Sequence, residues 1–204
     1  MIELELIPPV AVIRIKSEGK LNIMDGKLMK DMIAKVHSIE DKDGEIRSAI
    51  ITGSGSSFVA GADIKEMQEM NPEEAESFSA LGHRLVGKLH ESRVVYIAAV
   101  NGYAFGGGLE LALACDIILA SKSTTFAQSE SNLGIIPGWG GTKNLPERIG
   151  KHRALKLMLT GERISTEEAL RIGLVDDVFE SNEELMEKAM ELAHKISEKS
   201  PLVI

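Results

Sequence analysis

The sequence predicts an α/β fold whose strands pair mainly in parallel, and two observations support that prediction. Short apolar runs typical of buried strands alternate along the chain with longer segments in which apolar residues recur at helical spacing. Where strands alternate with helices, each helix returns the chain to the same end of the sheet, which favours parallel pairing. The 204 residues contain no internal repeat, linker or low-complexity tract, so we expect a single domain over 1–204.

Local signals predict the first elements. In 10–16, isoleucines alternate with basic residues, as in a half-buried strand. Apolar residues of 26–39 form one helical stripe, and Asp25 before them is a suitable N-cap. Asn71 followed by Pro72 and two glutamates is a strong signal for a helix start, because Asn caps a helix and Pro fits its first turn.

Apolar runs and capping signals predict the remaining elements. Ser165 and Ser181 each open a capping box with Glu three residues later, and Gly173 ends the first of these two helices. We therefore expect further strands at 46–52, 94–100, 116–120 and 174–179. We expect helices at 71–91, 107–114 and 165–172, and a C-terminal helix at 182–199.

Composition and charge exclude several classes of partner. The net charge is −8 and no two basic residues are adjacent, so nucleic acid and acidic membrane surfaces are not expected partners. The apolar stretch 94–120 contains Asn101, Glu110, Asp116 and four glycines, so we expect buried strands and a helix there rather than a membrane span. The start of the chain lacks the basic region of a signal peptide, and we expect a cytoplasmic protein.

Histidine and cysteine usage predicts no metal or disulfide. The five histidines lack the spacing of metal ligands, and His83 and His90 are expected on a solvated helix face. The single cysteine, Cys115, lies in an apolar run and is expected to be a small core residue.

Three glycine-rich loops, at 53–62, 102–108 and 134–141, are candidate binding segments. None matches the dinucleotide-binding fingerprint, a P-loop or the elbow of serine hydrolases. A glycine loop that leads into a helix presents free backbone N–H groups that can bind an anion. Tight strand–helix packing explains the same glycines equally well, so both interpretations stay open at this point.

Two glutamates accompany these loops. Glu110 follows three consecutive glycines and is the only charge between Arg93 and Asp116. Burying an isolated carboxylate is costly, and we expect the N-terminus of its helix to offset part of that cost. Glu130 lies in a loop just before the third glycine loop, where it is either a solvated side chain or a second acid. The residues alone thus indicate an enzyme with an anion-stabilising glycine loop and one or two catalytic acids.

Three stretches resemble the enoyl-CoA hydratase/isomerase (crotonase) family in order and spacing. They are AGADIKEM at 60–67, AAVNGYAFGGGLEL at 98–111 and LGIIPGWGGT at 133–142. The resemblance extends from about residue 10 to the end of the sequence. It implies the ClpP/crotonase fold, a spiral of repeated ββα units forming one core domain, and acyl-CoA substrates.

The resemblance also implies roles for particular residues. Backbone N–H groups of Ala62 and Gly107 would form an oxyanion hole for the thioester oxygen, where each such donor is worth ~10²–10³ in rate. Glu110 would orient and activate the water that attacks C3, and Glu130 would deliver a proton to C2, although a close pair of acids can share these roles. The residues expected to bind the substrate and its CoA part are Ala60, Ala62, Asp63, Ile64, Lys65 and Gly107. Lys65 is either a ligand for the CoA phosphates or a solvated loop lysine.

Both acids are present, so the expected activity is that of a hydro-lyase, enoyl-CoA hydratase, which adds water to a trans-2-enoyl-CoA to give a 3-hydroxyacyl-CoA. Alternatives are an isomerase or hydrolase of the same family, or a silent member that only binds acyl-CoA. No metal or separate cofactor is implied, because coenzyme A is part of the substrate. The resemblance further implies a homo-oligomer, either a trimer or a dimer of trimers.

The sequence departs from the family pattern in three places. Ser129 replaces the proline that often precedes the second glutamate, which predicts a less stiff loop. Trp139 is bulky, so that it either trims the acyl pocket or only packs its loop. The chain stops at the apolar residues 201–204, and the C-terminal helical module of the family is expected to be short or missing. Truncation, proteolysis and a naturally trimmed protein all explain this ending, which puts assembly and activity in doubt.

Overall fold

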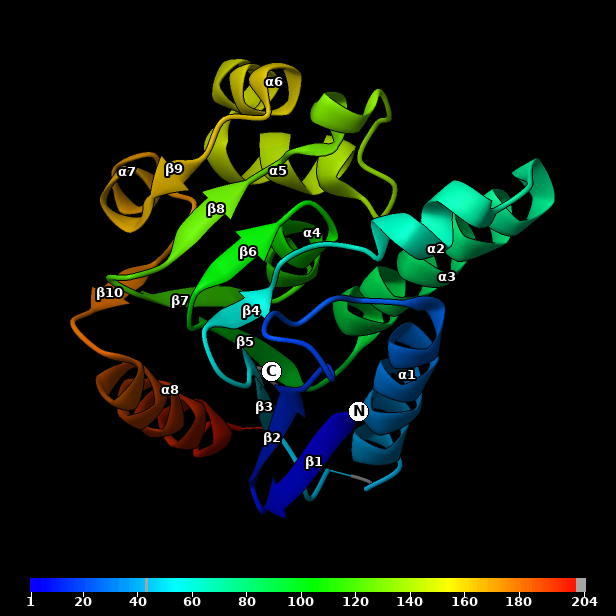
Figure 1. Ribbon diagram of the computed structural model, residues 1–204. Helices are drawn as coiled ribbons and strands as arrows, with labels where there is room; N and C mark the ends of the chain where they lie inside the picture. The colour runs from blue at the N-terminus through cyan, green and yellow to red at the C-terminus, as the bar shows by residue number, and fades with distance from the viewer. Residues whose placement is uncertain (43, 201–204) are drawn as a thin grey trace.

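The computed structural model describes residues 1–42 and 44–200, and it confirms the α/β prediction (Figure 1). Within these residues the strands are β1 (Ile2–Ile7), β2 (Val10–Ile15), β3 (Ser48–Gly53), β4 (Ser57–Val59), β5 (Val95–Val100), β6 (Tyr103–Phe105), β7 (Ile117–Ser121), β8 (Thr125–Ala127), β9 (Ile164–Ser165) and β10 (Asp177–Phe179). The helices are α1 (Gly26–Glu40), α2 (Ile64–Glu69), α3 (Pro72–Glu91), α4 (Gly107–Leu113), α5 (Gly141–Ile149), α6 (Lys151–Thr160), α7 (Thr166–Arg171), α8 (Asn182–Ser197) and the 3₁₀ turn η1 (Glu130–Leu133).

A six-stranded sheet in the order β1-β2-β3-β5-β7-β10 forms the base of the molecule. The pairs from β2 to β10 are parallel, as predicted, and β1 joins the edge antiparallel to β2. The register aligns four small or branched apolar residues across neighbouring strands: Ile13, Ile51, Ala98 and Ile118. All four are at most 1% exposed, so this row forms the centre of the main core.

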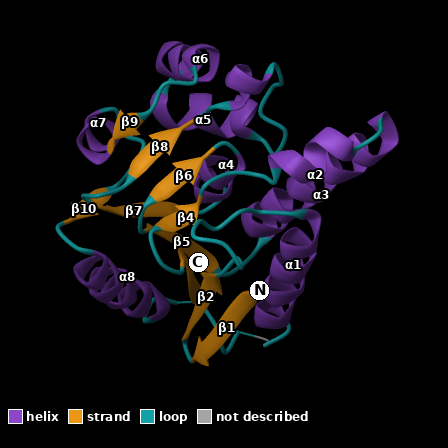
Figure 2. Ribbon diagram, viewed as in Figure 1, coloured by secondary structure: helices purple, strands orange, loops and turns teal. Residues whose placement is uncertain are grey.

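Helices cover the two faces of this sheet unequally (Figure 2). The face that carries Ile51 joins one large core with α1, α3 and α4. On the opposite face α8 alone contributes the buried helical residues, and Leu185, Ala189 and Ala193 follow the i, i+4 spacing of a single stripe. The hydroxyl groups of Ser48 and Ser197 share a hydrogen bond of 2.9 Å, in which either can be the donor, and this bond holds α8 against β3.

A second sheet, β4-β6-β8-β9, positions the loops that matter for function. Strands β4, β6 and β8 are parallel neighbours, so their carboxyl ends lie along one edge. The segments that leave this edge are 60–63, Gly106 with α4, and 128–130. A Cβ placed on Gly108 would lie 1.9 Å from the carbonyl oxygen of Val59, so glycine is required where α4 crosses β4.

Some elements were not predicted or differ in extent. The second sheet, β1, α5 and α6 were not expected, and the strand predicted at 174–179 is reduced to Asp177–Phe179. Strands of two or three residues are too short to show an alternating pattern. Cys115 is buried in the main core as expected. The apolar ending at 201–204 lies outside the described residues.

No helix in the described part of the chain is long and apolar enough to cross a bilayer.

Candidate active site

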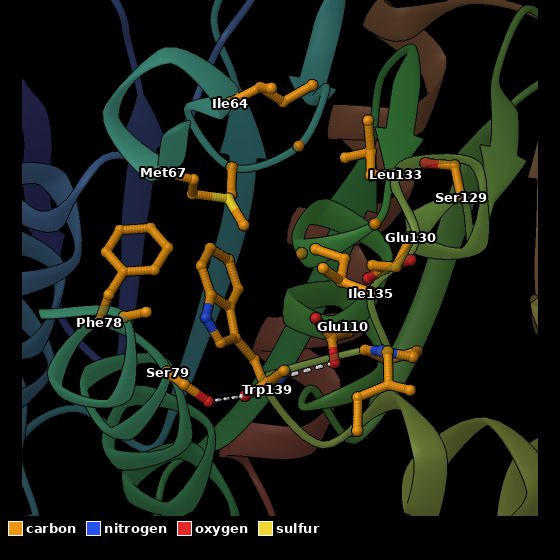
Figure 3. Close-up of a pocket in the computed structure, with 18 of the residues that line it drawn as sticks. Ile64, Met67, Phe78, Ser79, Glu110, Ser129, Glu130, Leu133, Ile135 and Trp139 are labelled. Carbon is orange, nitrogen blue, oxygen red and sulfur yellow. Dashed lines mark hydrogen bonds between the residues drawn. The ribbon is translucent and has the colours of Figure 1, made fainter. Parts of the chain in front are cut away.

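A pocket of about 490 Å³ lies at the edge where β4, β6 and β8 end (Figure 3). Its lining comes from the segment after β4, from α2 and α3, from the start of α4, and from the loop between η1 and α5. The exposure of the lining residues distinguishes a mouth from a floor. Ile136 is 78% exposed, whereas Trp139 is 5% and Glu110 is 1% exposed. The two carboxylates singled out in the sequence, Glu110 and Glu130, both line this pocket.

The glycine loop before α4 leaves a backbone N–H for a ligand. Gly106 has a positive φ of 51°, which turns the chain into the helix, and its own N–H donates to the carbonyl of Ala127 at 2.9 Å. Gly107 is the first residue of α4, and the N–H of a first helical residue has no partner within its helix. Gly107 lines the pocket, which makes its N–H a candidate donor to a substrate.

Ala62 has a similar position on the opposite side. The backbone around it pairs with Met24, whose N–H donates to the carbonyl of Gly61 and whose carbonyl accepts from Asp63. This pattern uses the backbone groups on either side of Ala62 and leaves the N–H of Ala62 itself out of the bridge. Ala62 lines the same pocket as Gly107.

Glu110 is held by backbone donors from a distant segment. Its Oε1 accepts hydrogen bonds from the N–H of Trp139 at 2.8 Å and from that of Gly141 at 2.7 Å. Glu110 lies in the first turn of α4, as expected. Gly141 is the first residue of α5, so the start of a second helix, which was not expected, also contacts this carboxylate. Burial raises the pKa of Glu110 to about 7; the bond from Gly141 counteracts this rise, the charge of Glu130 adds to it, and the bond from Trp139 counteracts it further.

Glu130 is also buried, which makes the solvated interpretation wrong. It is 8% exposed and begins the 3₁₀ turn η1 rather than lying in an irregular loop. The side-chain amide of Gln128 donates to its Oε1 at 2.8 Å, while its buried Oε2 has no hydrogen-bond partner among the described residues. Burial raises the pKa of Glu130, and the hydrogen bonds from its own backbone and from Gln128 oppose that rise.

Gln128 is a site residue that the sequence reasoning missed. Its side chain is completely buried, and within the described chain its Oε1 has no hydrogen-bond partner. A Cβ placed on Gly141 would lie 3.0 Å from Oε1 of Glu110 and 3.1 Å from Oε1 of Gln128. Gly141 therefore lies between Glu110 and Gln128, the residue whose amide holds Glu130. No local sequence signal points to Gln128, because its contact with Glu130 depends on the turn that begins at Glu130.

Trp139 does more than pack its loop, because it also lines the pocket. It is 5% exposed and packs its loop against the rest of the protein. Its ring lies 5.8 Å from the ring of Phe78, centroid to centroid. Figure 3 shows the indole between Phe78 and Glu110.

The segment expected to bind the CoA part is only partly in the pocket wall. Ala60, Ala62 and Ile64 line the pocket. Asp63 instead caps α2, because its Oδ1 accepts from the N–H groups of Lys65 and Glu66. Lys65 is exposed and lies in the first turn of α2 rather than in a loop.

The histidine prediction is confirmed in that His83 and His90 are exposed on α3, although His83 also reaches the pocket wall. Among the residues that the structure describes, no group of three or more His, Cys, Asp or Glu side chains is arranged to hold a metal ion.

Comparisons with known proteins identify the family and the fold. The family model described as enoyl-CoA hydratase/isomerase matches residues 8–204. The chain is 44% identical to a short-chain-enoyl-CoA hydratase from Clostridium acetobutylicum, covering 96% of this chain and 74% of the relative. It is 40% identical to a crotonyl-CoA hydratase from Syntrophomonas wolfei, covering 98% of this chain and 77% of the relative.

Solved structures give the same result. A crystal structure of enoyl-CoA hydratase from Bacillus anthracis superposes with a TM-score of 0.93 at 37% identity, covering 98% of this chain and 78% of the other. The chain therefore belongs to the enoyl-CoA hydratase/isomerase family, and its fold is the crotonase fold.

Proposed function

We propose that this protein is an enoyl-CoA hydratase, a hydro-lyase that adds water across the trans-2 double bond of an enoyl-CoA to give a 3-hydroxyacyl-CoA. The observation that carries the proposal is the presence of two buried carboxylates, Glu110 and Glu130, in one pocket with the N–H groups of Ala62 and Gly107. Hydration needs one group to take a proton from water and one to give a proton to carbon, and it needs donors for the charge that develops on the thioester.

In this mechanism the N–H groups of Ala62 and Gly107 donate to the thioester oxygen. When water adds to C3, the electrons of the double bond move toward the carbonyl and that oxygen gains negative charge. Donors that already point at the oxygen stabilise this enolate without reorganisation. Small residues at both positions leave the N–H groups accessible to the acyl group.

Glu110 acts as the base. Its Oε1 is occupied by two backbone hydrogen bonds, which leaves Oε2 for the attacking water. The water oxygen forms the bond to C3, one water proton passes to Glu110, and the other hydrogen remains on the new hydroxyl. Two observations support this role. The pKa of Glu110, about 7, is close to neutral pH, where a general base works best. The two backbone N–H donors also stabilise the charged form of the carboxylate.

Glu130 acts as the acid. Its Oε1 is held by Gln128 while its buried Oε2 is unpartnered, as expected for the oxygen that carries a proton to be donated to C2. The pKa values of both acids are raised, so each binds a proton more tightly than a solvated glutamate does, and two such acids in one pocket can share a proton. The next water restores the starting state by carrying the proton from Glu110 to Glu130.

The rest of the substrate is proposed to lie along the segment 60–65, with Asp63 fixing the start of α2 and Lys65 beside the CoA phosphates. No separate cofactor takes part. If Lys65 contacts the phosphates, Lys65→Ala raises KM for crotonyl-CoA a few-fold with little change in kcat, and added salt narrows the difference.

We also propose a cytoplasmic homotrimer or dimer of trimers. The bacterial origin of several relatives supports the location. Large apolar side chains that are exposed on the surface, such as Ile136 at 78% and Leu159 at 74% exposed, support assembly. Light scattering of the purified protein measures its mass in solution, and a monomer at micromolar concentration would contradict the assembly.

The experiment that tests the activity follows the loss of crotonyl-CoA absorbance and identifies the product by mass. Hydration adds one water to the substrate, whereas isomerisation leaves its mass unchanged. Turnover to a product heavier by one water supports the proposal. A folded protein that binds CoA esters without turning over any enoyl-CoA would contradict it and would favour a silent binding member.

A further inference from the structure

One tryptophan forms the buried wall of the pocket, and two glycines make room for it. A Cβ placed on Gly82 in α3 would lie 2.0 Å from Cδ1 of Trp139, and one placed on Gly107 in α4 would lie 2.2 Å from its Cζ3. The indole thus bridges the space between the two helices, with its pyrrole edge against Gly82 and its benzene edge against Gly107. No side chain at either position is compatible with this placement.

The indole is also fixed relative to the acids. The backbone N–H of Trp139 donates to Oε1 of Glu110 at 2.8 Å, and the indole packs on Gly107, whose N–H is proposed to hold the thioester oxygen. Both groups that anchor the reacting part of the substrate are therefore in direct contact with this residue. The pocket lining contributed by α2 and α3 and the residues between them includes the apolar residues Met67, Met70, Ala75 and Phe78, together with Ser79 and His83.

We propose that Trp139 sets the depth of the acyl end of the pocket and restricts the protein to short-chain enoyl-CoA esters. The proposal rests on the proposed hydratase function. An acyl chain anchored at Gly107, with its double bond beside Glu110, meets the face or edge of the indole within a few carbons. A longer chain has to displace a side chain that is 5% exposed and packed between two helices. The mouth offers no such barrier, because Ile64 and Ile136 there are 46% and 78% exposed.

The first test compares kcat/KM for crotonyl-, hexenoyl-, octenoyl- and decenoyl-CoA in the wild type, Trp139→Phe and Trp139→Ala. We expect kcat/KM of the wild type to fall steeply with acyl length. Trp139→Ala raises the ratio of decenoyl- to crotonyl-CoA by roughly 10-fold or more, the size expected for fitting extra methylenes into an apolar pocket. Trp139→Phe gives an intermediate ratio. The backbone bond to Glu110 does not depend on the side chain and is retained in all variants.

A matched control separates pocket depth from general destabilisation. Tyr96 is a completely buried aromatic residue of β5 that does not line the pocket. We expect Tyr96→Leu to lower the melting temperature but to leave the ratio between acyl lengths unchanged. If both variants change the ratio equally, the proposal is wrong.

The wild type supplies an independent test, because Trp139 is its only tryptophan. Tryptophan emission is titrated with coenzyme A alone, butyryl-CoA and decanoyl-CoA, none of which can be hydrated. We expect butyryl-CoA to shift the emission at lower concentration than decanoyl-CoA, and coenzyme A alone to leave it nearly unchanged. Equal responses to all three would contradict the contact between acyl group and indole.

The outcomes also separate this inference from the hydratase function. Absence of turnover with every enoyl-CoA contradicts the proposed function itself. Hydration with a flat length profile that Trp139→Ala does not alter contradicts only the role of Trp139.

Discussion

The two buried carboxylates of the pocket are held by different kinds of group. Glu110 receives its hydrogen bonds from backbone N–H groups at the start of α5, and both go to the same oxygen. Glu130 receives a side-chain hydrogen bond from Gln128, and its other oxygen is buried without a partner in the described chain. Backbone donors are independent of side-chain identity, whereas the support of Glu130 depends on a single residue.

This difference indicates how one pocket supports two opposite proton transfers. Two N–H donors on one oxygen favour the charged form of Glu110, as a base requires. An unpaired, buried oxygen on Glu130 is better satisfied as a hydroxyl that donates to the substrate. Burial alone raises the pKa of both groups, so the distribution of donors, rather than burial, distinguishes the proposed roles.

The largest expected effect is the loss of either acid. Glu110→Gln and Glu130→Gln should each lower kcat for crotonyl-CoA by ~10²–10⁴, the usual range for removing a group that transfers a proton. The double variant should lose less than the product of the two single losses, because the acids act as one unit. Steady-state kinetics measures this. A wild-type rate in either variant would remove that residue from the mechanism.

The next largest effect is expected at Gln128, the side chain that supports Glu130. Gln128→Met removes the donor to Glu130 with little change in volume and should lower kcat by roughly 10-fold. Because Glu130 then lacks a bond that favours its charged form, the alkaline limb of the pH–rate profile should move to higher pH. Profiles of wild type and variant measure the shift. A lower rate with an unmoved profile would mean that Gln128 has only a packing role.

Gly141→Ala is the matching change beside Glu110. Its methyl group would lie 3.0 Å from Oε1 of Glu110, which forces a small movement of the carboxylate while the N–H donor is retained. We expect a smaller loss of kcat than for Gln128→Met. We also expect the acidic limb of the pH–rate profile, which reports the base Glu110, to shift. The methyl group would also lie 3.1 Å from Oε1 of Gln128. If the acidic limb stays in place and the alkaline limb moves, the change acts through Gln128 and Glu130 instead of through Glu110.

A smaller effect concerns stability. The pKa of Glu110 is raised in the folded protein from 4.5 to about 7, so the folded state binds this proton more tightly than the unfolded state. The free energy of unfolding therefore falls as the pH rises through that interval. Glu110→Gln, which can still accept both N–H bonds, should be more stable than wild type by ~1–3 kcal/mol above about pH 8. Urea unfolding should show this advantage vanish near pH 4.5; a constant difference would contradict it.

The smallest effect is expected at Ser129, beside Glu130. Its φ of −101° is not far from the range of proline. Ser129→Pro should change the free energy of unfolding by less than ~1 kcal/mol, through the entropy of the unfolded chain. Thermal melts measure this change. A large loss of stability or of kcat would show that the freedom of this position matters to Glu130.

The large elements were predictable because each shows its own periodicity. The helical stripe of 26–39 reflects the burial of one face of α1. Alternation around Ile13 correctly predicted a strand, although β2 is buried on both faces over most of its length and is not half-buried. The edge strand β1 was not predicted, although Ile2 and Leu4 alternate with glutamates, because only Ile2 of this strand is buried and the apolar pattern is correspondingly weak.

The candidate site was predictable only in part. Glu110, Glu130 and the glycine loop that contains Gly107 stand out from the residues themselves, whereas Ala62 and the role of each residue came from the resemblance to family motifs. The structure brings all four residues to one pocket. The contact between α5 and Glu110, and the importance of Gln128, arise from tertiary packing between distant segments. No local pattern reports such contacts, so they could not have been read from the sequence.

The dependence of one sheet face on α8 has a consequence for synthesis of the chain. A ribosome that has translated through β10 has produced every strand of the large sheet, yet Ile50, Ile97 and Leu119 still await the helix that covers them. During that interval the nascent protein displays a continuous apolar surface, the kind that chaperones bind and that favours aggregation. Release of α8 from the exit tunnel is therefore the step after which the large sheet is protected on both faces.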